Sequence, residues 1–192
     1  MNPARDNILA RIRAALQTAA PRPPMPTAAP VFPPVTDLET RFRDELIALR
    51  GEWIESADKL RELLAGFPKI ATDGSELVVQ AVGAGNAGVR EADLGVSTCD
   101  CLIAQTGSVV VSTHSTRGRA VSVLPPVHLV IARREQLVPD LPAAMARLRA
   151  RYDGHWPSSL SVITGPSRTA DIEKILVLGA HGPRRLAVWL AG

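Results

Sequence analysis

The 192-residue chain is poor in the residues on which several protein classes depend. Its two cysteines, Cys99 and Cys101, are one residue apart, which does not suit an ordinary disulfide, and an iron–sulfur cluster needs four thiolates. No run of eighteen apolar residues occurs, so no membrane span is expected. The N-terminus lacks the basic start, apolar core and cleavage site of a signal peptide. We therefore expect a cytoplasmic protein with no cofactor of its own.

Aromatic residues and lysines are also scarce. Aromatic side chains make up 4% of the chain, and of its 22 basic residues only Lys59, Lys69 and Lys174 are lysines. Without a basic run or interleaved aromatic residues, nucleic acid is not an expected partner, whereas an excess of arginine favours small anionic metabolites. The four histidines and two cysteines show no H-x-x-x-H or C-x-x-C spacing, so no bound metal is predicted.

The remaining composition is that of one globular domain, with 46% hydrophobic and 21% charged residues. Apolar stretches predict strands at 77–82, 101–104, 108–112, 127–132, 160–164 and 186–190. Helical spacing predicts helices at 38–49, 142–152 and 170–178. This alternation predicts an α/β fold, an open and mainly parallel sheet with helices on both faces. The short Gln105-Thr106-Gly107 connection predicts a hairpin, with Gly107 at positive φ.

The first 34 residues differ from the rest of the chain. Ile8, Leu9, Ile12 and Leu16 share one face of a predicted amphipathic helix, which we interpret as a docking helix. Seven of the fourteen residues from 21 to 34 are proline, a composition that favours an extended arm. We therefore predict an N-terminal helix and proline-rich arm at 1–34 and one domain at 35–192.

Residues Gly83 to Gly88 spell G-x-G-x-x-G directly after a predicted strand. Binding of a dinucleotide needs a long helix after the third glycine, because the first amides of that helix hold the pyrophosphate. Only about five residues follow before Asp93 and Gly95 interrupt the segment, so there is no room for such a helix. We predict a tight or flexible loop here.

Several blocks together resemble the LUD-domain family, in its lactate-utilisation protein C branch. The blocks are Ala92 to Val96, Asp100, Ile103 to Val110, Leu124 to His128, Thr164 to Glu173 and Leu178 to Pro183, together with the helix from Ile8 to Leu16. The resemblance covers essentially the whole chain. It implies a fold similar to the NagB, ribose-5-phosphate isomerase and CoA-transferase group. It also implies membership of a set of proteins required for oxidising L-lactate to pyruvate, in which the companions carry iron–sulfur clusters.

The sequence departs from the family at Gln105. The resemblance implies a glutamate there, in a turn similar to the position of the acylated glutamate of CoA transferases. An amide is neither a carboxylate nucleophile nor a general base, so an acyl-glutamyl intermediate is excluded. Gln105 still has hydrogen-bonding groups, and Thr106, Gly107 and Ser108 either contact a ligand with it or form only a turn.

A second candidate site is Gly165-Pro166-Ser167-Arg168-Thr169, which follows a predicted strand and precedes the helix predicted at 170–178. Free amides at a helix start, two hydroxyl groups and a guanidinium suit a phosphate or carboxylate. The alternative is an ordinary helix cap, with Arg168 paired to Asp171. His181, in a glycine-containing loop, is added to this ligand-binding set.

The candidate catalytic residues are Asp100, Gln105 and His128, although a histidine on an apolar strand is more often a core residue. The leading functional hypothesis is an accessory or ligand-binding subunit of an iron–sulfur-dependent system that oxidises L-lactate. One alternative is a free-standing isomerase or transferase with Asp100 or Asp93 as base and Arg168 as anion clamp. Another is an interaction module that docks through its first 34 residues. The isolated chain is expected to show no redox activity.

Overall fold

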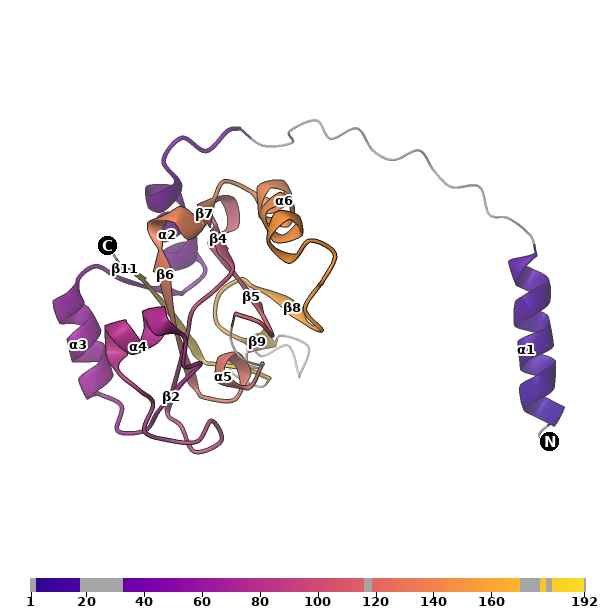
Figure 1. Cartoon of the computed structure of the whole chain (residues 1–192), viewed down its shortest axis with the longest axis horizontal. Helices are drawn as coiled ribbons and strands as arrows, with labels where there is room; N and C mark the ends of the chain where they lie inside the picture. Colours follow the sequence, from indigo (N-terminus) through magenta and orange to yellow (C-terminus); the bar gives the residue numbers. More distant parts are fainter. Residues whose placement is uncertain (1–2, 18–32, 116–118, 170–176, 179–180, 192) are drawn as a thin grey trace. The chain divides into compact units, whose positions relative to one another are not determined.

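The computed structural model describes residues 3–17, 33–115, 119–169, 177–178 and 181–191. The chain divides into two compact units, residues 1–33 and 34–192. The first contains helix α1 (Pro3–Leu16), in which the side chains of Ile8, Ile12 and Leu16 are exposed. The predicted N-terminal helix is therefore present, and every other labelled element belongs to the second unit (Figure 1).

The larger sheet of the second unit has five strands, all parallel, in the order β1-β11-β6-β3-β2. The strands are β1 (Glu52–Ile54), β11 (Arg185–Ala191), β6 (Val127–Arg133), β3 (Leu94–Ser97) and β2 (Ile70–Thr72). Because the strands are parallel, all their carboxyl ends meet at one edge of the sheet. That edge is where open α/β sheets bind ligands.

A second, mixed sheet has four strands in the order β7-β4-β5-β8. These are β7 (Leu137–Val138), β4 (Cys101–Ile103), β5 (Ser108–Ser112) and β8 (Leu160–Ile163). Strands β4 and β5 form the predicted antiparallel hairpin, which turns through the 3₁₀ helix η1 (Ala104–Thr106) and Gly107. The φ of Gly107 is +59°, as its position in the turn predicted.

The domain is built in four layers (Figure 1). Helices α3 (Ala57–Ala65) and α4 (Glu76–Val82) cover one face of the parallel sheet. Helix α2 (Leu38–Ala48) and the mixed sheet cover the other face, and α6 (Leu141–Tyr152) packs on the outer face of the mixed sheet. The predicted α/β class is confirmed. The mixed sheet takes much of one face, where only helices were expected.

Alternating side chains of β6 fix these layers. Leu129 and Ile131 belong to the core beneath α3 and α4, whereas Val130 and Ala132 belong to the core shared with α2 and the mixed sheet. Three helices begin at a capping residue, whose side-chain oxygen accepts a hydrogen bond from the backbone N–H three positions later. The caps are Asp37 for α2, Ser56 for α3 and Asp140 for α6.

Two predicted elements are wrong. The strand expected at 77–82 is helix α4, because the Asp73 carboxylate accepts the N–H and hydroxyl of Ser75 and turns the chain into the helix, whose Val78 is buried. The helix expected at 170–178 does not extend to its predicted end. Strand β10 (Val177–Leu178) pairs there with β9 (Arg168–Thr169), and residues 170–176 lie outside the described part.

The glycine-rich segment after α4 is a loop, as predicted, without a helix between Gly83 and Asp93. Asn86 joins this loop to the first residue of β2. The N–H of Ile70 donates to Asn86 Oδ1 at 2.8 Å, and Asn86 Nδ2 donates to the carbonyl oxygen of Pro68 at 2.9 Å. The loop therefore holds an edge strand of the sheet. In the ranges that the structure describes, no helix is long and apolar enough to cross a membrane.

Candidate functional site

The structure brings together two sequence blocks that were predicted to bind a ligand. The Oγ of Ser108, at the start of β5, lies 2.8 Å from Oγ1 of Thr164, which directly follows β8. The same hydroxyl lies 2.7 Å from Oγ1 of Thr106. The turn at Thr106–Ser108 and the segment that begins at Gly165 are therefore neighbours, although 56 positions separate Ser108 from Thr164.

Helix α2 lies directly against both blocks. A Cβ atom on Gly107 would stand 2.5 Å from the backbone nitrogen of Leu46, and one on Gly165 would stand 2.9 Å from the carbonyl oxygen of Leu49. Gln105 is half-buried, and its backbone N–H donates to the carbonyl oxygen of Pro139 at 3.0 Å. Both glycines thus have a packing role, which is to let the helix approach.

The second predicted ligand segment has a different geometry from the one expected. Pro166 is buried, and the N–H of Ser167 donates to the carbonyl oxygen of Pro183 at 2.9 Å. Arg168 is exposed and, with Thr169, forms strand β9. His181 is exposed. The helix start that motivated an anion site falls on residues 170–176, which lie outside the described residues, so ligand binding by this segment stays a prediction.

Asp100 is the centre of a buried polar network. Its carboxylate is fully buried and accepts the Tyr152 hydroxyl at 2.5 Å and the Ser115 hydroxyl at 2.9 Å. The Nε of Arg151 lies 3.5 Å from the same carboxylate, and the Tyr152 hydroxyl lies 2.7 Å from Ser112 Oγ. Burial and the hydrogen bond to Asp100 raise the pKa of Tyr152 to about 12. Asp100 therefore joins the mixed sheet to α6, a structural role that argues against its use as a base.

His128 lies between the two sheets and is fully buried. Its Nε2 lies 2.9 Å from Oγ of Ser97 on the neighbouring strand β3. Burial lowers the pKa of His128 to about 4, so the imidazole is neutral near pH 7. These features fit the core histidine that was the alternative to a catalytic role.

We expect acid to destabilise the protein through His128. The unfolded chain, with a histidine pKa of about 6.5, binds a proton that the folded chain excludes. The stabilising contribution of neutral His128 is therefore fully present above that pH and is lost as the pH falls towards 4. Between pH 7.5 and 5.5 the free energy of unfolding should fall by about 1.3 kcal/mol more in the wild type than in His128→Gln. Urea denaturation at both pH values measures this difference. Parallel losses in the two proteins would exclude His128 as the source.

Both cysteines are buried and free. Burial raises the pKa of Cys99 well above its ordinary value, and burial and the charge of Asp100 raise that of Cys101 to about 11. Both thiols are therefore protonated near pH 7 and weak nucleophiles there. No group of three or more His, Cys, Asp or Glu residues within the described ranges is placed to hold a metal ion.

A crevice opens at the carboxyl edge of the parallel sheet, with a volume of about 260 Å³. It lies among the ends of β3 and β6, the following 3₁₀ helix η2 (Arg134–Gln136) and helix α6. Its polar and charged lining includes Thr98, Cys99, Arg133, Glu135, Arg147 and Arg151. Three guanidinium groups and one carboxylate give this crevice a positive balance.

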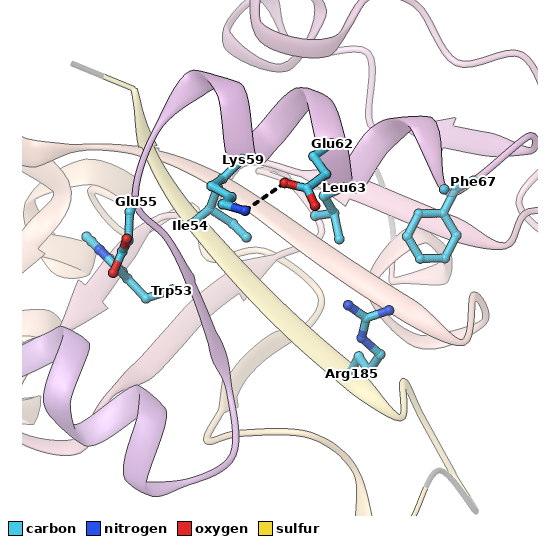
Figure 2. A pocket seen from close by; sticks show the side chains of 9 residues that line it. Trp53, Ile54, Glu55, Lys59, Glu62, Leu63, Phe67 and Arg185 are labelled. Atoms are coloured by element: carbon cyan, nitrogen blue, oxygen red, sulfur yellow. Dashed lines mark hydrogen bonds and ion pairs between the residues drawn. The ribbon is translucent and has the colours of Figure 1, made fainter.

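A larger groove, of about 660 Å³, runs along α3 and the edge strand β1 (Figure 2). Its apolar lining consists of Trp53, Ile54, Leu63 and Phe67. The cations at its rim are paired within the protein: Lys59 Nζ lies 2.7 Å from Glu62, and the Arg185 guanidinium makes two hydrogen bonds to Glu52 at 2.7 and 2.8 Å. The groove is therefore less suited to a small anion than the crevice.

Comparison with known proteins decides the family. The family model of the LUD domain matches residues 51–190. The chain belongs to the LUD domain family. Among curated relatives, "Lactate utilization protein C" of Macrococcus caseolyticus is 37% identical over 107 residues, 54% of this chain and 46% of that protein. The protein of the same name from Halalkalibacterium halodurans is 36% identical over 116 residues, 59% of this chain and 47% of that protein. The match thus spans about half the length of these relatives.

The fold of this LUD domain also matches a solved structure. A DUF162 family protein from Deinococcus radiodurans superposes with a TM-score of 0.57 and 21% identity, covering 81% of this chain and 96% of that chain. At this identity the likeness concerns the fold alone. It agrees with the α/β architecture that the sequence predicted.

Sequence reasoning missed the arginine crevice of this LUD domain. One signal was available, because Arg147 and Arg151 are four positions apart in a predicted helix and so share one of its faces. Arg133 gave no such signal, since its proximity to α6 depends on how the two sheets pack.

Proposed function

We propose that this LUD-domain chain is an accessory or ligand-binding subunit of an iron–sulfur-dependent system that oxidises L-lactate to pyruvate. The observation that carries the proposal is its identity of 36–37% with relatives named "Lactate utilization protein C". The chain has only two cysteines, too few to hold an iron–sulfur cluster through four thiolates, which supports a division of labour in which partner proteins hold the clusters. The proposed ligand is a small anionic metabolite, and the proposed location is the cytoplasm.

Growth on lactate tests this function. In the native cell, loss of the chain should abolish growth on L-lactate and leave growth on pyruvate unchanged, because only the step before pyruvate is affected. Returning the full chain should restore growth on L-lactate. Undiminished growth of the deletion strain on L-lactate would contradict the proposal.

Co-purification tests the partnership. The tagged full chain, isolated from lactate-grown cells, should bring down proteins that contain iron and acid-labile sulfide. The chain purified alone should be colourless and should not oxidise L-lactate with an artificial electron acceptor. A stoichiometric iron–sulfur or flavin spectrum in the isolated chain would overturn the division of labour.

A further inference from the structure

We propose that the crevice at the carboxyl edge of the parallel sheet binds a small organic carboxylate that carries a hydroxyl or keto oxygen beside its carboxyl group. The inference starts from three guanidinium side chains, those of Arg133, Arg147 and Arg151, which line one space of about 260 Å³. It deepens the proposed function and rests on it for the choice among small carboxylates.

Several separate parts of the fold supply the side chains that line the crevice. Arg133 ends β6, and Thr98 and Cys99 directly follow β3, the neighbouring strand. Arg147 and Arg151 lie one turn apart on α6, which packs on the other sheet. The crevice thus lies where parallel α/β sheets bind ligands, and a helix from a different layer closes it with positive charge.

The charges of the crevice favour an anion. Glu135 is the one carboxylate among its lining residues, against three arginines. The Nε of Arg151 faces the buried Asp100 at 3.5 Å, and one N–H of Arg147 donates to the carbonyl oxygen of Glu135 at 2.6 Å. A guanidinium has five N–H donors, so these contacts orient the two side chains and leave donors for a carboxylate, which arginine binds through two parallel hydrogen bonds.

The size and remaining lining of the crevice restrict the ligand. Pockets for drug-sized molecules have volumes of about 300–1,000 Å³, so this crevice suits a ligand of few non-hydrogen atoms. Leu77 offers apolar contact, and the neutral thiol of Cys99 does the same. The Thr98 hydroxyl can donate to or accept from an oxygen on the carbon beside the carboxylate. A short hydroxy or keto acid matches this combination.

The walls of the crevice are held by hydrogen bonds within the protein. The Oε1 of Gln136 accepts a hydrogen bond from the backbone N–H of Arg133 at 2.7 Å. The Nε2 of Gln136 donates to the carbonyl oxygen of Cys99. The N–H of Thr98 donates to the Asp73 carboxylate at 2.8 Å. The Gln136 contacts join the ends of β3 and β6, and the Thr98 contact joins the end of β3 to the segment after β2, which reduces the ordering cost of binding.

Calorimetric titration of the full chain tests the proposal with four probes: L-lactate, pyruvate, propionate and inorganic phosphate. Lactate and pyruvate should bind more tightly than propionate, which has the carboxylate without the neighbouring oxygen. Arg147→Gln should weaken lactate and pyruvate binding by about 10- to 100-fold. The matched control is Arg149→Gln, on the same helix with an exposed side chain that does not line the crevice, and it should leave affinity unchanged.

Arg133→Gln, at an exposed strand end, is the second variant and should weaken binding in the same direction, with thermal melting as the check on folding. Absence of carboxylate binding, equal affinity in Arg147→Gln and the wild type, or phosphate binding tighter than every carboxylate would overturn the inference. These results are independent of growth on lactate: a chain that is required for growth but binds no carboxylate refutes the crevice and leaves the proposed function standing. A chain that binds the carboxylates but is not required for growth on lactate refutes the proposed function and leaves the crevice standing.

Discussion

Asp100→Ala is expected to lower the free energy of unfolding by about 3–5 kcal/mol. The substitution removes the acceptor of two buried hydroxyl groups, those of Tyr152 and Ser115, and the partner of Arg151. Hydrogen bonds to a charged group are stronger than neutral ones, and buried donors left without an acceptor are costly. The contribution of Arg151 is small because its side chain is 48% exposed. Urea denaturation, followed by circular dichroism, measures the loss.

The control for this experiment is Asp44→Ala. The side chain of Asp44 is 62% exposed, so its removal should change the free energy of unfolding by no more than about 0.5 kcal/mol. A loss in Asp100→Ala as small as that in Asp44→Ala would show that the network does not join the mixed sheet to α6 energetically.

Gly107→Ala is expected to cost about 2–5 kcal/mol of folding free energy. Two effects add: a φ of +59° is strained for alanine, and the new Cβ would stand 2.5 Å from the Leu46 backbone nitrogen and 2.7 Å from the Glu45 carbonyl carbon. Both contacts are with backbone, so helix α2 itself must move. Thermal and urea denaturation should show a large shift of the transition.

Gly154→Ala separates these two effects. Gly154 has a φ of +81°, but a Cβ there would meet no atom within 4 Å, so only backbone strain of about 1–2 kcal/mol is expected. The difference between the two alanine variants measures the cost of displacing α2. Equal losses would mean that the helix yields freely to the added methyl group.

Sequence reasoning predicted the elements whose signals are local. The apolar runs of β5, β6 and β11 were sufficient to place these strands, and helical spacing at 38–49 and 142–152 placed α2 and α6. Helix α4 was missed because its valines favour a strand, whereas the turn at Asp73 and the packing of Val78 favour a helix. The Asp73–Ser75 turn is local but lies outside the apolar pattern, and the packing of Val78 depends on contacts with the sheet; periodicity encodes neither.

The candidate sites were predictable to a smaller extent. Motif blocks predicted Thr106–Ser108 and Gly165–Thr169 as two candidate ligand-binding segments, and the Ser108–Thr164 contact makes them neighbours. The packing of α2 against these two segments could not be predicted, because it depends on the close approach of the helix backbone to Gly107 and Gly165. The arginine crevice depends likewise on the placement of two sheets and a helix.

The position of β11 has a consequence for synthesis of the protein on the ribosome. This strand lies between β1 and β6, and Glu52 of β1 bonds to Arg185, 133 positions later. Pairings of such large sequence separation form slowly. Until residues 185–191 have left the ribosome, β1 lacks the only partner it has among the described strands, and one edge of β6 is open. A nascent chain at this stage exposes an apolar sheet edge, so folding of the domain should finish late and benefit from chaperones.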